Sequence, residues 1–374
     1  MKNFIYLRTN KGVLIKRYVG ADTDVVIPEE IDGEKVYAIG DCAFRGTNVK
    51  SVFGSSIAII CEEAFKYALF LEHVDFPNLK EIREYAFEKS SIEEINIPKS
   101  MEVISKNAFT NSNLKSITVD KDCKNFTTEN GVLIMNDMAV FCPKGITEFS
   151  SDNVIACGDY CFHHSDIKNV TLPNLISIGA NAFEGTEIAE ILFSGKLKDI
   201  GDSAFKNCIK LKSIFIPSSV TSLGRSAFEG CRNLETAYFG DGLKVIPSKC
   251  FSKCHNLKEV DISYVEKINF CAFYDCYLLA DIGLGRVKEI GAKAFMNTAI
   301  STAVLNSAEK IGTFAFAYCS DLKEVTFSSN LYEIKRNVFD KCFGVNFAQT
   351  ATISWDEPPM ARNNNITDYR ANCA

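Results

Sequence analysis

A phenylalanine preceded by a small residue recurs along almost the whole chain of 374 residues. Successive copies are separated by 21 to 23 residues, with one exception, a step of 53. This period is typical of a repeat protein, because a unit this short buries its apolar side chains only by stacking on the next unit. The thirteen anchors are Phe44, Phe65, Phe87, Phe109, Phe162, Phe183, Phe205, Phe228, Phe251, Phe273, Phe295, Phe316 and Phe339.

Other positions follow the same register. The residue eight positions before each anchor is apolar in all thirteen copies, and the residue five before it is isoleucine in eleven. After the anchor, apolar residues alternate with others, as at Leu211, Ile214 and Ile216, and this period of two predicts a short strand. Glycine shortly before several anchors predicts a tight turn. Strands stacked coil on coil would form a parallel sheet.

The unit P-x-x-V-x-x-I-G-x-x-A-F-x-x-C-x-x-L-x-x-I-x-I-P resembles the BspA-like leucine-rich repeat over about residues 25–347. The resemblance implies an α/β-type repeat solenoid, curved and right-handed, with a parallel β-sheet on its concave face and about 13 coils of 21–23 residues. Such repeats occur in bacterial surface and secreted proteins and in protozoan parasites, where they are associated with adhesion and protein binding. The resemblance therefore implies a specific fold, but only a general class of function.

The charge balance is mildly acidic, with 41 Lys and Arg against 47 Asp and Glu. This argues against nucleic acid as a partner, because that affinity comes mostly from cations that neutralise phosphates. No run of 18 apolar residues is present, so no membrane span is expected, and the first residues lack the apolar core of a signal peptide. The cytoplasm is expected for the chain as given, and the cell surface or secretion if a leader has been removed.

Six of the fifteen cysteines share one column, three residues after the anchor, where the other residues are Ser, Thr or Ala. Cysteine is expected there as a small buried apolar side chain; a disulfide ladder or a metal column is the alternative. In-register neighbours lie about 4.8 Å apart with parallel side chains, whereas a disulfide needs facing Cβ atoms about 3.5–4.5 Å apart. The column contains Cys208, Cys231, Cys254, Cys276, Cys319 and Cys342.

A second cluster, Cys157, Cys161, His163 and His164, has a spacing that zinc can use. However, Cys157 occupies the isoleucine column, and Cys161 occupies the small-residue position before the anchor. Both side chains are therefore predicted to point into the core, and no metal site is expected.

The 53-residue step contains about 31 extra residues near 120–150. Residues 131–134 and 12–15 share the sequence Gly-Val-Leu-Ile, and turn signals such as Asn130-Gly131 predict hairpins. A surface loop without functional meaning is the alternative for the internal copy. The predicted division is an N-terminal hairpin cap with the first coil (1–43), a first repeat block (44–119), a hairpin insertion (120–153), a second repeat block (154–347) and a C-terminal cap or tail (348–374).

Enzyme signatures such as G-x-x-x-x-G-K-[ST], H-E-x-x-H and G-x-S-x-G are absent from the sequence. Only four histidines are present, and His73 is expected on a strand, facing outward, without a catalytic role. We therefore expect no enzymatic activity, no catalytic residue and no cofactor.

The outward positions of the strands are the best candidates for function. Most are polar, but Leu192, Phe215 and Tyr238 place apolar side chains in one column of three successive coils, over about 10 Å. An exposed apolar strip with a polar rim is typical of a contact site. The alternative is that aromatic and branched residues simply suit strands.

Three acidic residues, Glu259, Asp261 and Asp281, follow the strip in the next two coils and complete the candidate binding site. We expect a non-enzymatic, monomeric scaffold that uses the concave sheet to recognise a protein or a cell-surface glycoconjugate, with adhesion as one role. The alternative is an intracellular structural or interaction protein with no role at the surface.

Overall fold

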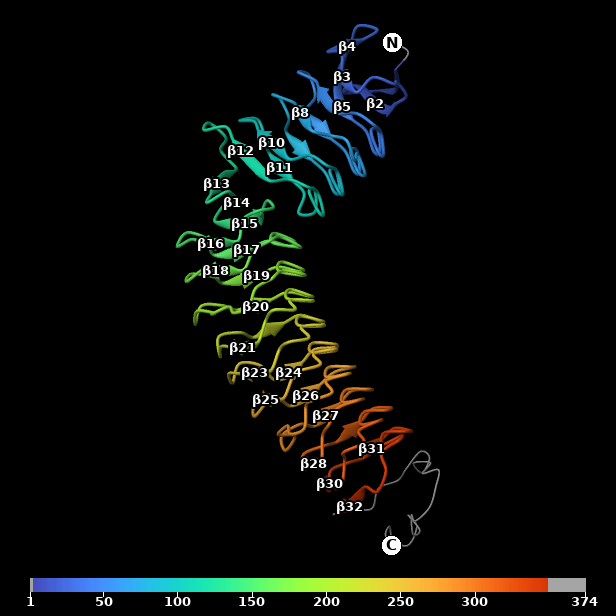
Figure 1. The fold of residues 1–374 in the computed structure, drawn as a ribbon, viewed down its shortest axis with the longest axis vertical. Helices are drawn as coiled ribbons and strands as arrows, with labels where there is room; N and C mark the ends of the chain where they lie inside the picture. The colour runs from blue at the N-terminus through green and yellow to red at the C-terminus, as the bar shows by residue number, and fades with distance from the viewer. Residues whose placement is uncertain (1–2, 349–374) are drawn as a thin grey trace. The chain divides into compact units, whose positions relative to one another are not determined.

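The structure, a computed structural model, describes residues 3–348, and these residues contain short strands and turns but no helix. They divide into two compact units, residues up to 167 (unit 1) and residues from 168 onward (unit 2), and Figure 1 shows the short strands of successive coils within them. In both units strands pair in parallel from coil to coil, so each unit is a parallel-strand β-solenoid. The predicted parallel sheet is confirmed. The α component of the predicted α/β class is wrong, because tight turns connect the strands.

Most coils contribute a longer strand to one layer, here called the face sheet, and a two-residue strand to a second layer, here called the back ladder. Strand pairing is interrupted along both layers, so each consists of several shorter hydrogen-bonded sheets. The face sheet of unit 1 contains β3 (Asp24–Val26), β6 (Ser51–Phe53), β8 (His73–Asp75), β10 (Glu94–Ile97), β12 (Ser116–Val119) and β16 (Glu148–Ser150). Its back ladder contains β5 (Glu34–Ile39), β7 (Ile59–Ile60), β9 (Glu81–Ile82), β11 (Val103–Ile104) and β17 (Ala156–Cys157).

Unit 2 repeats this arrangement. Its face sheet contains β18 (Asn169–Thr171), β21 (Ser213–Ile216), β23 (Thr236–Phe239), β25 (Glu259–Asp261), β28 (Thr302–Leu305), β30 (Glu324–Phe327) and β32 (Asn346–Ala348). Its back ladder contains β19 (Ser177–Ile178), β20 (Asp199–Ile200), β22 (Ser222–Leu223), β24 (Val245–Ile246), β26 (Lys267–Ile268), β27 (Glu289–Ile290), β29 (Lys310–Ile311) and β31 (Glu333–Ile334).

Antiparallel strands occur at the two segments that were predicted as hairpins. Near the N-terminus, β1 (Phe4–Thr9) pairs with β2 (Gly12–Tyr18), which continues the back ladder through β5, and β4 (Glu30–Ile31) also pairs with β5. In the internal segment, β13 (Thr127–Glu129), β14 (Val132–Met135) and β15 (Met138–Phe141) form a meander that joins β17. The assignment of the five predicted segments as separate modules remains a prediction.

The anchor phenylalanines form the centre of each unit. In unit 2 the rings from Phe183 to Phe339 stack with centroids 5.1–5.7 Å apart and planes within 16°. In unit 1 the stack from Phe44 to Phe109 is extended by Tyr18, whose ring lies 5.3 Å from that of Phe44. Tyr18 therefore acts as a further anchor. It explains in part why residues 3–348 make about 15 turns and not the predicted thirteen.

The backbone around each anchor forms a third hydrogen-bonded ladder that the sequence did not predict. The residues two before and two after Phe251, Lys249 and Lys253, have φ of 59° and 62°. The N–H groups of Lys249, Phe251 and Lys253 all donate to carbonyls of the next coil, over 2.7–2.9 Å. Left-handed residues at both positions recur in most coils, and they prevent a helix from continuing through the anchor.

The glycines before the anchors have a different role from the predicted one. Gly201 and Gly224 have no left-handed backbone, but a Cβ on Gly224 would lie 2.3 Å from the backbone of Gly201. Glycine is therefore required at these positions because the backbones of successive coils approach closely, and not because a turn needs a left-handed conformation.

The cysteine column is buried and unbridged, as predicted. Five of the six thiols are buried and Cys342 is half-buried. Each thiol donates to the carbonyl of the anchor in the preceding coil, over 3.0–3.1 Å. By contrast, the hydroxyls of Ser90, Thr186 and Thr298 in this column donate to the anchor of their own coil.

The predicted C-terminal cap or tail, 348–374, lies outside the described residues except for Ala348.

Candidate functional site

The predicted apolar strip faces solvent in unit 2. Leu192 exposes 79% of its surface and Phe215 exposes 58%, whereas Tyr238 is half-buried. In the parallel register of β21, β23 and β25, Phe215 lies beside Tyr238, and Tyr238 lies beside Asp261. One column of the face sheet thus changes from apolar to acidic within three neighbouring strands.

The acidic residues of the site are exposed, and two of them have local partners. A hydrogen bond with the Glu259 carboxylate raises the pKa of Tyr238, and the charge of Asp261 adds to this effect. Asp261 Oδ1 accepts hydrogen bonds from the N–H and the hydroxyl of Ser263, over 3.0 and 2.5 Å. Glu259 therefore connects the strip to the acidic patch, while Asp261 also holds the end of its own strand.

Two of the predicted site residues do not lie on strands, contrary to expectation. Segments 187–195 and 279–286, which contain Leu192 and Asp281, carry no strand. Gly283 and Gly285 explain the second interruption, because glycine weakens a strand. In the first segment the Ala189 carbonyl still accepts from Lys212 N, but over 3.4 Å, and nothing in its sequence explains the break. The strand island β21–β23–β25 thus lies between two irregular coils.

A smaller strip in unit 1 was not predicted. Val26, 71% exposed, lies beside Phe53, and Phe53 lies beside Asp75, in one column of β3, β6 and β8. The ring of His73 is 5.5 Å from that of Phe53; His73 is exposed, as expected. The sequence signal was available, because residues 24–28 read Asp-Val-Val-Ile-Pro, an apolar run closed by proline before the first anchor.

The Cys157 cluster does not bring three metal ligands together. Cys157 and Cys161 are buried, as predicted, while His164 is exposed and its ring lies edge-on to that of His163 at 4.3 Å. Across residues 3–348 no group of three or more His, Cys, Asp or Glu side chains is placed to hold a metal ion.

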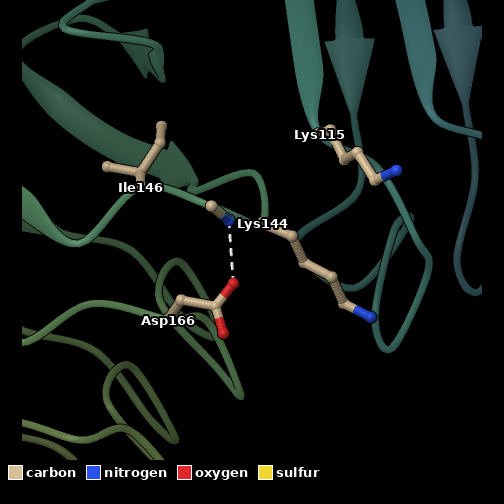
Figure 2. A pocket seen from close by; sticks show the side chains of 5 residues that line it. Lys115, Lys144, Ile146 and Asp166 are labelled. Carbon is tan, nitrogen blue, oxygen red and sulfur yellow. Dashed lines mark hydrogen bonds between the residues drawn. The ribbon is translucent and has the colours of Figure 1, made fainter.

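An open hollow of about 550 Å³ lies in unit 1 beside the end of the hairpin insertion (Figure 2). Its charged groups already have partners. Lys115 Nζ is 2.6 Å from Glu93, Lys144 Nζ donates to Asn113 over 3.4 Å, and the Asp166 carboxylate accepts from Gly145 N over 2.8 Å. The hollow brings no nucleophile next to a base, so it suggests no catalytic chemistry.

Residues 3–348 contain no helix that is long and apolar enough to cross a membrane.

Several solved structures share this fold. A leucine-rich repeat protein from Eubacterium ventriosum is 20% identical, with 88% of this chain and 92% of that chain covered and a TM-score of 0.56. One from Bacteroides ovatus is 20% identical, with 96% and 99% covered and a TM-score of 0.51. The pneumococcal vaccine antigen PcpA is 20% identical, with 70% and 67% covered and a TM-score of 0.54.

No curated protein sequence matches the chain. The sequence model of the BspA type leucine rich repeat region does match, in six copies over residues 23–130, 155–280 and 244–354. These matches cover most of the chain and coincide with the stacked coils. The chain belongs to the family of BspA type leucine rich repeat proteins.

Proposed function

We propose that the protein is a non-enzymatic binding scaffold that recognises another protein, or a cell-surface glycoconjugate, through the face sheet of unit 2. The observation that carries this proposal is the exposure of Phe215 beside Tyr238 on neighbouring strands, with Leu192 exposed in the preceding coil. Apolar surface of this kind is removed from water when a partner binds, and this contributes roughly 25 cal/mol per Å². The hydroxyl of Tyr238 and the carboxylates of Glu259 and Asp261 can orient a bound ligand through hydrogen bonds.

We favour a role outside the cell, and more specifically a role in adhesion. Its support is the shared fold of a pneumococcal vaccine antigen. An intracellular interaction protein with no surface role would use the same sheet, so the two versions differ in compartment and not in site.

A pull-down with the full chain tests the proposal. Phe215→Asp/Tyr238→Asp places two charges in the strip. Val304→Asp/Thr326→Asp places two charges at the corresponding strand positions of β28 and β30, which form a separate sheet, and is the matched control. We expect partners recovered by the wild type and the control to be lost with the strip variant. Equal recovery by all three chains would rule out the strip as the contact site.

A further inference from the structure

The face sheet of unit 2 carries a one-sided charge. Its outward positions, taken as the two central residues of each coil from Asn169 to Thr326, include acidic residues but no Lys or Arg. None of these carboxylates lies within 4 Å of a cationic side chain in the described residues. The acidic residues are Glu190, Glu259, Asp261, Asp281 and Glu324.

Three nearby cations are engaged elsewhere. Lys258, next to Glu259 in sequence, lies 3.0 Å from Glu235. Beyond the strand ends, Lys244 and Arg286 lie over the ring of Tyr264, at 5.4 and 6.0 Å. The negative charge beside the apolar strip is therefore not compensated by these neighbours.

The change from apolar to acidic also occurs in unit 1. Val26, Phe53 and Asp75 follow one another in one column, as Phe215, Tyr238 and Asp261 do in unit 2. In both units the acidic residue comes from the later coil. The same combination thus arises in two separate parts of the chain.

We propose that the face sheet of unit 2 binds an extended peptide segment that combines an apolar side chain with Lys or Arg. This inference rests on the proposed function and adds the chemistry of the partner. Coils are about 4.8 Å apart, and an extended peptide rises about 3.3 Å per residue. A peptide that crosses the strands reaches from Phe215 to the level of Asp261 in about three residues, so the basic residue follows the apolar one about three positions away.

The apolar side chain of the peptide packs on Phe215 and Tyr238, and its cation lies between Glu259 and Asp281. These two carboxylates are the ones to change. Asp261 is left intact, because it also accepts two hydrogen bonds from Ser263. Glu259→Gln/Asp281→Asn removes both charges and keeps the side-chain size and an acceptor for Tyr238. Glu324→Gln is the matched control, because Glu324 lies on β30 in the separate sheet β28–β30–β32, outside the strands that carry the strip.

The probe is a display library of random 12-residue peptides, selected on the full chain. We expect the enriched peptides to carry net positive charge and an apolar residue, and to bind more weakly as salt is raised from 0.05 to 0.5 M. Synthetic copies should bind Glu259→Gln/Asp281→Asn roughly two- to thirtyfold more weakly, because each exposed ion pair contributes little. Affinity for Glu324→Gln should be unchanged.

Other outcomes separate this inference from the proposed function. Neutral or acidic peptides that lose binding to Phe215→Asp but not to Glu259→Gln/Asp281→Asn would overturn the basic partner and leave the strip as a binding site. If no enriched peptide depends on Phe215, peptide recognition by this face is overturned, and the pull-down alone decides whether the strip binds a folded protein or a glycoconjugate.

Discussion

The thiol of Cys254 donates a hydrogen bond to the carbonyl oxygen of Phe228 in the preceding coil, over 3.1 Å. The same oxygen accepts from the backbone N–H of Cys231, over 3.2 Å. One anchor carbonyl thus closes its own turn and ties down the next coil. Sulfur suits this position because its longer bond reaches across the coil spacing, whereas the hydroxyls of Ser90 and Thr298 bond within their own coil.

Replacing Cys254 therefore tests the link between coils. Cys254→Ala removes the donor and leaves a small cavity, and we expect a loss of about 1–3 kcal/mol in the free energy of unfolding. Cys254→Ser should cost less, because its hydroxyl can use the Phe251 carbonyl. Urea unfolding measures both. Unfolding of the alanine variant at the wild-type urea midpoint would show that the thiol adds nothing to stability.

Ser112 offers the reverse change. It occupies the same column in unit 1, it is 4% exposed, and its hydroxyl has no hydrogen-bond partner. Ser112→Cys should reach the carbonyl of Phe87 in the preceding coil and raise the free energy of unfolding by about 0.5–1.5 kcal/mol. Ser90→Cys is the control, because Ser90 already bonds its own anchor and has less to gain. An equal effect at both positions would contradict this explanation.

Stability should fall in alkaline solution because of the buried thiols. Burial raises the pKa of Cys142 to about 12 and that of Cys61 to about 11, against about 8.5 for a thiol in an unfolded chain. The folded chain keeps these protons to higher pH, so these two thiols leave the free energy of unfolding unchanged below about pH 8. It falls between about pH 8.5 and 11–12, by up to about 1.4 kcal/mol per pH unit per thiol.

Urea midpoints at pH 7, 9 and 10.5 measure this dependence. Cys61→Ala/Cys142→Ala should show a shallower decline than the wild type, because two of the responsible groups are gone. The same slope in both chains would assign the alkaline loss to other groups. In native protein at pH 8 a thiol reagent should label exposed Cys42 quickly and the buried column slowly.

Much of the fold could be predicted, because one period fixes many positions at once. The stacking of Phe205 on Phe228 and the burial of Cys231 both follow from their columns. The repeat predicted a face-sheet strand in every coil, and this was wrong in two of them. Leu192 and Asp281 lie in coils without a strand in the face sheet. The repeat pattern does not include Gly283 and Gly285, which weaken the second strand, and nothing in the sequence explains the loss of the first.

The sequence predicted which residues of the candidate site face outward, but it did not predict the hydrogen bonds between them. The period placed Phe215 and Tyr238 in one outward column, but the hydrogen bond of Tyr238 with Glu259 joins different columns. The two restraints that Ser263 places on Asp261 likewise depend on the turn after the strand. Val26 was missed because its coil precedes the first anchor from which the register was counted.

A pair of glycines tests the close approach of coils. Gly224→Ala puts a Cβ against the backbone of Gly201 and Asp202, about 2.3 Å away, whereas Gly283→Ala enters open space with an ordinary backbone. We expect Gly224→Ala to lower the unfolding midpoint clearly, because backbone atoms cannot move aside without shifting a coil. Gly283→Ala should be neutral or slightly stabilising. A smaller effect at Gly224 than at Gly283 would refute the packing role.

Two phenylalanines separate stability from binding. Phe228 is buried in the stack, with rings on either side at 5.4 Å, whereas Phe215 exposes 58% of its surface. Phe228→Ala should cost about 3–5 kcal/mol in the free energy of unfolding, and Phe215→Ala should stay within about 0.5 kcal/mol of the wild type. Calorimetry of both variants measures this. If Phe215→Ala also destabilises by several kcal/mol, the ring supports the fold, and its loss of partners in a pull-down would no longer point to a contact site.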